Sequence, residues 1–308
     1  MRPLALALVA ASVVACAGIP RQRVSLAQDV GPEPSATIER TPAVAPLRIA
    51  VANVVSPKES FRTYQDLIAY VGRRTGRPTE LIQRGTYAEI NALLRSGNAD
   101  LAFVCSLAYV QAADERSAEL LVTPVIDGRS EYWSDLIVPV ASAARSMGDL
   151  RGAVFAYTDP LSNSGWLAPA YALWGSGEAP AGFFRRTIYT YSHDNSIRAV
   201  ADSLVDGAAV DSLVYDNTIA RDPDIARRVR VLARFGPFGA PPVVVARGLS
   251  AARKAELRSI LLGLASDPAG VRILAALRID RFVTLEDRAY DTVRQMRDAL
   301  AAAGLFQP

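Results

Sequence analysis

The segment Tyr157-Thr-Asp-Pro-Leu-Ser-Asn-Ser-Gly-Trp-Leu-Ala-Pro169 joins an apolar run at residues 152–156 to an apolar segment of helical character at residues 166–174. The first predicts a short buried strand and the second a helix. Four small or polar residues precede the helix: Ser162, Asn163, Ser164 and Gly165. Such residues cap helices and leave the first backbone N–H groups free, which together with the helix dipole favours an anion, and glycine permits close approach of a ligand. In a second interpretation, Ser162 or Ser164 only caps the helix.

Length and composition limit the class of protein. The chain has 308 residues, which is enough for two domains, and it is 50% hydrophobic and 21% charged, as in a globular protein. The formal net charge is +3 and no run is rich in Lys and Arg. We therefore expect no binding to nucleic acid.

The N-terminus has the pattern of an export signal. Arg2 precedes an apolar run at residues 4–14, too short to span a bilayer, and Val13-Val-Ala-Cys16 follows. This ending resembles the lipobox of bacterial lipoproteins, which implies a signal peptide at 1–15 and a lipid on Cys16. A plain signal peptide, in which Cys16 is incidental, is the alternative. Residues 16–46 are rich in proline and predict a disordered tether.

Cys105 is the only other cysteine. With Cys16 lipidated, no intrachain disulfide can form, so stability has to come from the core. Cys105 follows the apolar run 101–104, which favours a packing residue at the end of a strand over a nucleophile.

Strand and helix patterns alternate from residue 47 onward and form two successive sets, which predicts two α/β lobes with mainly parallel sheets. The strands expected in the first set lie at 47–52, 79–83 and 100–104. Its first helix is expected to end near Gly76, and two further helices are expected at 87–94 and 106–113. Two longer extended runs follow at 119–125 and 132–140, and the second is a candidate crossing between lobes. The later strands are expected at 152–156, 187–191, 207–210, 229–233 and 243–246, with a break at 236–242. The later helices are expected at 166–174, 195–204, 213–220, 251–264, 269–277 and 286–300.

Several motifs together resemble the periplasmic substrate-binding proteins of phosphonate, phosphite and phosphate ABC importers. They are Asp159-Pro-Leu-Ser-Asn-Ser-Gly165, Ser192-His-Asp-Asn-Ser-Ile-Arg-Ala-Val200, Val205-Asp-Gly-Ala-Ala-Val-Asp-Ser-Leu-Val-Tyr215, Asp100-Leu-Ala-Phe-Val-Cys-Ser106 with Ala108-Tyr109, and Tyr132-Trp-Ser134. The resemblance covers essentially everything after Pro46. It implies the type II periplasmic-binding-protein fold, in which two α/β lobes meet at a ligand cleft and a two-strand hinge. We expect lobe 1 at 47–136 and 239–308, and lobe 2 at 137–238.

The resemblance also implies a set of ligand-binding residues. It places the oxyanion of the ligand at Ser162, Asn163, Ser164 and Gly165, and His193 at the position of a binding histidine. Tyr87 matches a tyrosine that donates its hydroxyl, although a half-buried aromatic at a helix start is an equal interpretation. Ser106 is a further hydroxyl or N–H donor. Asp211 and Ser212 end a buried strand at the edge of the cleft, where α/β sheets place ligands.

Asp211 has two interpretations. It could accept a proton from a singly protonated phosphoryl oxygen, which would exclude sulfate, or it could only cap the following helix. Two departures from the family pattern bear on the ligand. Val104 stands where some members have another binding tyrosine, and Ala240 or Pro241 stands where some have an acid that pairs with a ligand amine. The first means that one hydroxyl donor is missing, and the second favours a small ligand such as phosphite, phosphate or methylphosphonate over an aminophosphonate.

The predicted function is therefore capture of a small phosphorus oxyanion by hinge closure, for delivery to an ABC permease in the inner membrane. We expect a monomer on the periplasmic side of the envelope (the cell surface in a monoderm), held to the membrane by its lipid alone. One alternative is a sensing lipoprotein that reports to a membrane kinase. A Ser/His hydrolase is disfavoured because the chain lacks a Gly-x-Ser-x-Gly elbow, and with one histidine and no Cys/His cluster we expect no metal and no cofactor.

Overall fold

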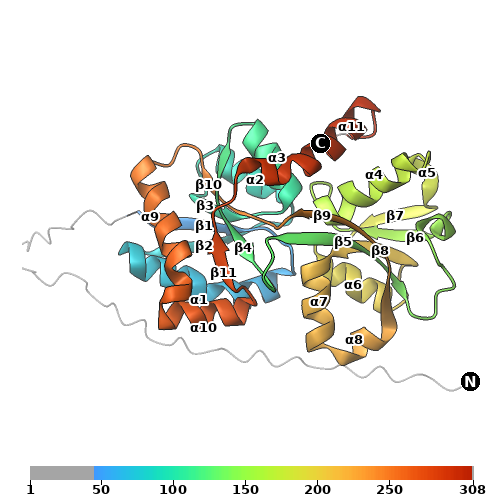
Figure 1. Cartoon of the computed structure of the whole chain (residues 1–308), viewed down its shortest axis with the longest axis horizontal. Coiled ribbons are helices and arrows are strands. Elements are labelled where there is room, and N and C mark those ends of the chain that lie inside the picture. The colour runs from blue at the N-terminus through green and yellow to red at the C-terminus, as the bar shows by residue number, and fades with distance from the viewer. Residues whose placement is uncertain (1–44, 307–308) are drawn as a thin grey trace, which may run out of the picture. The chain divides into compact units, whose positions relative to one another are not determined.

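The computed structural model describes residues 45–306. The predicted signal peptide, Cys16 and nearly all of the predicted tether lie outside the described residues. Within 45–306 the chain forms two β-sheets, and each is packed between helices (Figure 1). We call the part built on the first sheet lobe 1 and the part built on the second sheet lobe 2. The predicted α/β class and type of fold are confirmed.

Lobe 1 contains a six-stranded sheet of order β11-β4-β10-β3-β1-β2. Its strands are β1 (Leu47–Val51), β2 (Thr79–Gln83), β3 (Leu101–Phe103), β4 (Ala118–Val125), β10 (Val243–Ala246) and β11 (Arg281–Val283). Its helices are α1 (Pro57–Thr75), α2 (Tyr87–Arg95), α3 (Ser106–Asp114), α9 (Ala251–Leu262), α10 (Pro268–Leu277) and α11 (Asp291–Ala302), with 3₁₀ turns η3 (Gly263–Ser266) and η4 (Asp287–Tyr290).

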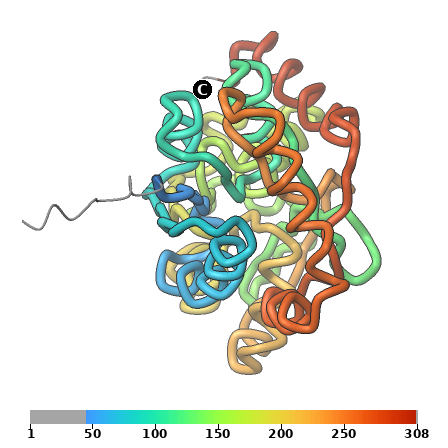
Figure 2. Tube along the Cα trace, turned by 90° about the vertical axis from the view of Figure 1, so that its left-hand side faces the viewer, coloured from blue at the N-terminus to red at the C-terminus, as the bar shows by residue number. Residues whose placement is uncertain are grey.

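The two faces of this sheet have separate cores. Alternate residues of one strand point to opposite faces, so Ile49 packs toward α1, α9 and α10 while Ala50 packs toward α2, α3 and α11. Figures 1 and 2 both show the blue α1 beside the orange α10, and α1 contacts α9 as well. Because both faces are covered, the central strands are mostly apolar, with Arg48 as the exception in β1, which is why the sequence predicted β1 and β3.

Local signals set the helix ends in this lobe. Gly76 ends α1 with a positive φ of 64°, as the sequence predicted. Thr86 and Glu89 form a capping box at the start of α2. Within residues 45–306, no single helix has the length and apolar composition of a membrane span; the pair Ala251–Ser266 and Pro268–Leu277 meets both criteria together but is bent by 90°.

Lobe 2 contains a five-stranded sheet of order β7-β6-β8-β5-β9. Its strands are β5 (Glu131–Pro139), β6 (Val154–Tyr157), β7 (Arg186–Tyr189), β8 (Gly207–Asp211) and β9 (Val229–Gly239). Its helices are α4 (Ala168–Gly175), α5 (Pro180–Phe183), α6 (His193–Ala201), α7 (Ser212–Arg221) and α8 (Pro223–Arg228), with a 3₁₀ turn η1 (Met147–Leu150) and a π-helical turn η2 (Asn163–Leu167).

Two antiparallel strands carry the chain between the lobes. β5 follows β4 of lobe 1 and β9 precedes β10 of lobe 1, and the two pair from Glu131 with Gly239 to Pro139 with Val229. The expected lobe boundaries at 136 and 238 fall inside these two strands. The bidentate ion pair between Arg234 and the fully buried Asp135, at 2.7 and 2.8 Å, joins them further.

Two predictions about the sheets are wrong. The sheets are mixed, not mainly parallel, because four of the nine strand pairs are parallel and five antiparallel. An apolar run such as 243–246 does not reveal its direction when helices cover both faces. The expected break at 236–242 begins later than predicted, because β9 continues to Gly239 and only residues 240–242 separate it from β10. Pro237 is tolerated there because β9 is an edge strand.

Candidate functional site

The segment after β6 forms the turn expected from the sequence, with one difference. Ser162 caps the following helix through its Oγ, which accepts from Gly165 N–H at 2.9 Å. The helix opens with the π-helical turn η2, in which Leu167 N–H reaches back five residues to the Ser162 carbonyl. Asn163 and Ser164 therefore lie inside the first turn of the helix and do not precede it. Such turns occur often at functional sites.

Glycine at 165 is required by a neighbour in the fold. A Cβ at this position would lie 2.5 Å from Cβ and Oγ1 of Thr158. The close approach that the sequence assigned to a ligand is thus made by the Thr158 side chain, which fixes the turn against the end of β6.

Three buried polar atoms near this turn have no hydrogen-bond partner among the described residues. They are the Ser164 Oγ, the Asn163 Oδ1 and the Tyr87 hydroxyl. The two lobe 2 residues are fully buried and Tyr87, at the start of α2 in lobe 1, is 1% exposed. An unsatisfied buried polar group is costly, so these three atoms are the candidates for contact with a ligand.

Tyr132 and Cys105 complete this group, which we call the buried polar cluster (Tyr87, Cys105, Tyr132, Asn163 and Ser164). Asn163 Nδ2 donates to the Tyr132 hydroxyl at 2.9 Å, and Asn163 N–H donates to Cys105 Sγ at 3.4 Å. Burial raises the pKa of both tyrosines well above its usual value and that of Cys105 to about 11, with neighbouring Asp211 adding to each shift. All three groups therefore remain protonated donors at neutral pH.

In the reversed orientation of its amide, Asn163 has a free N–H donor where its unpartnered oxygen would otherwise lie. O and N of an amide are assigned from the hydrogen-bond network. Turned over, Oδ1 accepts from the Tyr132 hydroxyl, and Nδ2 takes the place of the amide atom without a partner. The cluster then presents O–H and N–H donors, as an anion requires.

His193 is buried beside the cluster and is uncharged. Burial lowers the pKa of its imidazole to about 3. The Asp211 N–H donates to Nδ1 at 3.0 Å, and the Thr158 Oγ1 lies 3.1 Å from the same nitrogen. Because Nδ1 accepts, the proton is on Nε2, and His193 is a neutral donor through that atom.

Asp211 has the capping role that was one of its two interpretations from the sequence. Its Oδ1 caps α7 by accepting from the N–H groups of Leu213 at 2.8 Å and Val214 at 3.4 Å. Burial raises the pKa of its carboxyl to about 7. At neutral pH it can therefore exchange a proton with a bound group.

Three predicted hydroxyl groups already have backbone partners. Ser106 Oγ donates to the Gly239 carbonyl at 2.8 Å, and Ser212 Oγ accepts from Trp133 N–H at 3.0 Å. Ser162 Oγ is the cap described above. These contacts hold the ends of β9 and β5 to the site, so these serines position it at least as much as they contact a ligand.

Sequence reasoning missed the residues that join the two lobes. Asp159 Oδ2 accepts from Tyr87 N–H at 3.1 Å, and Asp194 Oδ1 accepts from Ser56 N–H at 2.8 Å. His193 N–H donates to the Val54 carbonyl at 3.0 Å. Each carboxylate faces the N-terminus of a helix of the other lobe, where the dipole favours it. The motif Asp159-Pro160 indicated only a turn.

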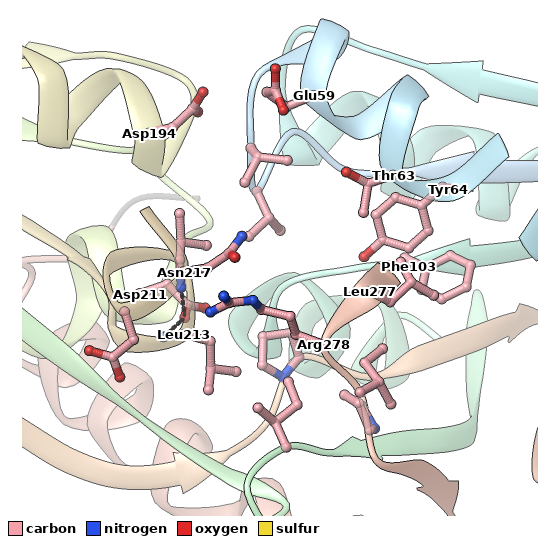
Figure 3. Close-up of a pocket in the computed structure, with 18 of the residues that line it drawn as sticks. Glu59, Thr63, Tyr64, Phe103, Asp194, Asp211, Leu213, Asn217, Leu277 and Arg278 are labelled. Atoms are coloured by element: carbon pink, nitrogen blue, oxygen red, sulfur yellow. Dashed lines mark hydrogen bonds between the residues drawn. The ribbon is translucent and has the colours of Figure 1, made fainter. Parts of the chain in front are cut away.

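A cavity of about 510 Å³ lies between the lobes, and we call it the cleft cavity. Figure 3 shows Glu59, Thr63 and Tyr64 on its lobe 1 side and Asp194 and Asn217 on its lobe 2 side. Of the predicted site residues, only Asp211 lines it. Ser162, Asn163, Ser164, His193 and Tyr87 lie outside its lining, in the closed part of the interface. Val104, Pro241 and Pro242 also line it.

No buried cation offsets the charge of a bound anion. Among residues 45–306, the buried acidic and basic side chains are aspartates and His193, and none is Lys or Arg. An anion in the buried polar cluster would be held by neutral donors and by the N-terminus of the η2 turn.

Comparisons with known proteins agree with this geometry. Residues 49–290 match the family model described as "ABC transporter, phosphonate, periplasmic substrate-binding protein". The chain is 26% identical over 215 residues to the "Phosphonates-binding periplasmic protein" of Escherichia coli, which covers 68% of this chain and 63% of that protein. It is 30% identical over 174 residues to the "Phosphate-import protein PhnD" of Mycolicibacterium smegmatis, which covers 53% of this chain and 54% of that protein. The chain thus spans less than two thirds of the length of these curated relatives.

A solved structure gives the same fold. The binding protein component of an ABC phosphonate transporter from Pseudomonas aeruginosa superposes with a TM-score of 0.78 at 24% identity, covering 84% of this chain and 92% of that one.

Proposed function

The chain belongs to the family of periplasmic substrate-binding proteins of phosphonate ABC transporters, and from this premise we propose that it binds a phosphorus oxyanion between its two lobes and delivers it to an ABC permease. The relatives named above are a phosphonate-binding and a phosphate-import protein. Because the chain spans only part of their length, its own ligand and partner are part of the proposal.

One observation carries the proposal: buried polar atoms without partners come from both lobes, on segments that the hydrogen bonds from Asn163 N–H to Cys105 and from Tyr87 N–H to Asp159 join across the interface. Tyr87 belongs to lobe 1, while Asn163 and Ser164 belong to lobe 2. An oxyanion has several acceptor oxygens and can accept from the hydroxyls of Tyr87 and Ser164 and, when the amide of Asn163 is in its reversed orientation, from Asn163 Nδ2. A hydrogen bond to a charged group contributes about 1.5–3 kcal/mol, so a few suffice for micromolar or tighter binding.

The predicted ligand contacts divide into two groups under this proposal. We assign direct contact to Tyr87, Asn163, Ser164 and His193, and proton exchange to Asp211. We assign to Ser162, Gly165, Ser106 and Ser212 the positioning of these groups.

Closure of the lobes is the proposed mechanism of capture. Tyr87 and Ser164 are too buried for a ligand to enter without separation of the lobes. The hinge we propose is the β5–β9 pair, with lobe boundaries near residues 136 and 238. An anion that contacts both lobes favours the closed state because only there are both sets of bonds made.

Asp211 provides a proposed basis for choosing among anions. In its ionised form the carboxylate accepts from a protonated phosphoryl oxygen but repels a fully deprotonated anion. Sulfate carries no proton near neutral pH. Singly protonated phosphate, phosphite or phosphonate is therefore expected to bind better than sulfate.

The location and anchoring of the protein are also proposed. The relatives are periplasmic binding proteins, and we propose the same side of the envelope for this chain, with a lipid on Cys16 and a monomeric binding lobe pair. Replacement of Cys16 with Ser should move the protein from the membrane to the soluble fraction. Retention in the membrane would contradict lipid anchoring.

We propose no catalytic role. In a Ser/His hydrolase the histidine donates Nδ1–H to a carboxylate, whereas here Nδ1 of His193 accepts from a backbone N–H. Nothing in the described residues favours the sensing lipoprotein over import.

A thermal-shift panel tests the proposed function. Phosphate, phosphite, methylphosphonate, 2-aminoethylphosphonate and sulfate are compared on the purified chain. A ligand at 100 times its dissociation constant adds about 2.7 kcal/mol of stability. A shift with a phosphorus oxyanion and none with sulfate is expected, and no shift with any phosphorus oxyanion would refute the proposal.

A further inference from the structure

The interface between the lobes has two edges that are held in different ways. At the edge with the cleft cavity the contacts are polar: Asp194 Oδ1 accepts from Ser56 N–H at 2.8 Å, and His193 N–H donates to the Val54 carbonyl at 3.0 Å. At the other edge, α11 of lobe 1 contacts η2 and α4 of lobe 2. Figure 1 shows α11 and α4 above the crossing strands β5 and β9, and α1, α10, α6 and α7 below them.

The edge at α11 is apolar. One hydrophobic core extends there from lobe 1 into lobe 2, and we call it the shared core. Its buried members from lobe 2 are Leu161, Leu167, Ala168 and Ala170, and those from α11 are Val293, Met296 and Leu300. The buried members of each of the other three cores come from one lobe only. The lobes are therefore packed together by hydrocarbon side chains at this edge alone.

The composition of α4 fits a helix with a neighbour on each side. It has no charged residue. Leu173 packs in a core of lobe 2, whereas Ala168 and Ala170 belong to the shared core. A helix that lacks a polar face requires cover on more than one side. Lobe 2 supplies one cover and α11 supplies the other.

Phe306 extends this packing to the turn that carries the oxyanion donors. Its ring and that of Trp166 have centroids 5.5 Å apart and are tilted by 56°. Trp166 belongs to η2, the same turn as Asn163 and Ser164. Phe306 and the neighbouring Leu305 both pack against the shared core. A side chain of lobe 1 thus holds the ligand-binding turn of lobe 2.

Ion pairs fix α11 to lobe 1. Arg297 Nη1 lies 2.5 Å from Asp114 Oδ2 at the end of α3, and Arg294 Nη2 lies 2.7 Å from Asp287 Oδ1 in η4. Both arginine side chains are mostly buried. Since these pairs join α11 to its own lobe, its apolar side remains available for lobe 2.

α11 begins beside the proposed hinge. A Cβ on Gly239, the last residue of β9, would lie 2.8 Å from the Ala289 carbonyl oxygen. The hydroxyl of Tyr290, which directly precedes α11, donates to the Ala240 carbonyl at 2.9 Å. Because displacement is smallest near the axis of a hinge motion, contacts at this position can persist while the lobes move.

The two edges differ in what separation costs. Breaking a hydrogen bond that water replaces changes an equilibrium roughly 2–12-fold. Exposing one fully buried Leu or Met side chain changes it roughly 10–150-fold. The cavity edge offers a few such hydrogen bonds, whereas the α11 edge would expose several apolar side chains. The lobes therefore separate more readily at the cavity edge.

From these contacts we infer that α11, with Leu305 and Phe306, is a clasp that keeps lobe 1 packed on η2 and α4 while the lobes separate at the cleft cavity. The clasp and the β5–β9 pair together set the axis of closure. Phe306 is a positioning residue, which acts on the ligand through Trp166 and the η2 turn. This inference rests on the proposed function, because it describes how capture by closure takes place.

Distances between pairs of spin labels test the inference. The cavity pair is Lys58→Cys with Asn195→Cys, and the clasp pair is Gln295→Cys with Ser176→Cys; all four positions are exposed. The labels are attached to the full chain carrying Cys16→Ser, and that chain without introduced cysteines is the control for labelling of Cys105. Saturation with inorganic phosphate or methylphosphonate should shorten the distance of the cavity pair. The distance of the clasp pair should stay within the width of its own distribution.

A variant of Phe306 tests its positioning role. Phe306→Ala should weaken binding of phosphate and methylphosphonate roughly 2–12-fold, the contribution of one aromatic pair. It should also broaden the distance distribution of the clasp pair in the ligand-free protein, and Phe306→Leu should bind more tightly than Phe306→Ala. The matched control is Trp174→Ala, which removes a pair of similar geometry within α4, since the rings of Tyr171 and Trp174 are 5.6 Å apart and tilted by 44°. The control should change neither quantity.

The outcomes separate the inference from the proposed function. A clasp pair that shortens as much as the cavity pair would overturn the inference and leave the proposed function intact. Unchanged binding and an unchanged clasp distribution in Phe306→Ala would overturn it as well. If neither phosphate nor any phosphonate binds the unmodified chain, the proposed function is wrong. The ligand-free distribution of the clasp pair then decides: broadening in Phe306→Ala alone supports the clasp, and no broadening overturns it.

Discussion

The closed end of the interface between the lobes, built around Asn163 and Ser164, contrasts with its open end, the cleft cavity beside Tyr64 and Phe103. The closed end has little space and several polar atoms without partners. The open end has about 510 Å³ of space, and its buried wall combines apolar side chains with the carboxyl groups of Asp194 and Asp211. Asp211 is the residue that belongs to both.

We infer from this difference that recognition of an oxyanion and discrimination between oxyanions depend on different parts of the chain. The closed end depends on one turn after β6 and on single atoms facing it from the start of α2. The open end depends on side-chain volumes from α1, β3, α7 and α10. We therefore expect substitutions at the closed end to decide whether an oxyanion binds, and substitutions at the open end to decide which one.

The largest effect is expected at the closed end. Tyr87→Phe combined with Ser164→Ala removes two hydroxyls that have no partner in the ligand-free protein. At about 1.5–3 kcal/mol each, their loss should weaken oxyanion binding by roughly 10²–10⁴-fold. Because neither hydroxyl has a protein partner, the unfolding temperature of the ligand-free protein should stay nearly unchanged. Calorimetric titration and thermal unfolding measure the two quantities.

The matched control removes the same groups elsewhere. Tyr191→Phe with Ser259→Ala deletes two hydroxyls from exposed residues and should leave both affinity and stability unchanged. A large loss of ligand-free stability in Tyr87→Phe/Ser164→Ala would instead assign these hydroxyls to the core.

Asp211, which lies where the two ends of the interface meet, should make the free energy of unfolding depend on pH. Its carboxyl ionises near 3.8 when unfolded and near 7 when folded. Between these values the folded protein binds the extra proton, so the free energy of unfolding falls as pH rises from about 4 to about 7, by roughly 4 kcal/mol at most. Asp211→Asn removes this dependence. Urea unfolding of the unmodified protein and of Asp211→Asn from pH 4 to 8 measures this dependence. The contributions of other groups, including His193, are expected to cancel in the difference between the two free energies of unfolding. Parallel curves would contradict the raised pKa.

Packing behind the closed end is expected to show an intermediate effect. Gly165→Ala places a methyl group 2.5 Å from the Thr158 side chain, which should destabilise the protein by about 1–3 kcal/mol. Gly175→Ala at the end of α4 meets no atom within 4 Å and is the control. Denaturant unfolding compares them. An unchanged midpoint in Gly165→Ala would show that the turn shifts freely and does not hold Asn163 and Ser164 in place.

The smallest effect is expected at Asp194, a buried residue in the wall of the open end. Asp194→Ala removes the carboxylate that accepts from Ser56 N–H across the lobes. Loss of one hydrogen bond should weaken all ligands by roughly 2–10-fold, because closure and not a ligand contact is affected. The thiol of Cys105, buried in the closed state, should react faster with a thiol reagent, as located by mass spectrometry. Asp202→Ala, at the other end of α6, is the control. A loss confined to large ligands would place Asp194 in contact with the ligand.

The sequence predicted most elements whose signal is local. The strands 79–83 and 243–246 and the end of α1 at Gly76 are confirmed to within a residue. It did not predict the direction of β10 or the continuation of β9 through Pro237, because strand direction and edge position depend on which strands become neighbours. β11 and α8 were missed as well, since each is short and carries too few residues for a periodic pattern.

At the candidate site the same division holds. The polar turn at 162–165 is legible in the sequence because a cap, a small residue and an apolar helix lie within a few positions of one another. The contact of Asp159 with Tyr87 joins residues 72 positions apart, and that of Asp194 with Ser56 joins residues 138 apart. No local pattern encodes such pairs.

The sequence by itself therefore determined the α/β series, the polar turn and the donors that an oxyanion needs, because these follow from chemistry within a few residues. Only the tertiary structure decided that Ser162, Ser106 and Ser212 have backbone partners while Tyr87, Asn163 and Ser164 do not. It also decided the size and lining of the cleft cavity. Both depend on how two separately formed sheets meet, and that arrangement is set by the sum of many contacts between distant parts of the chain.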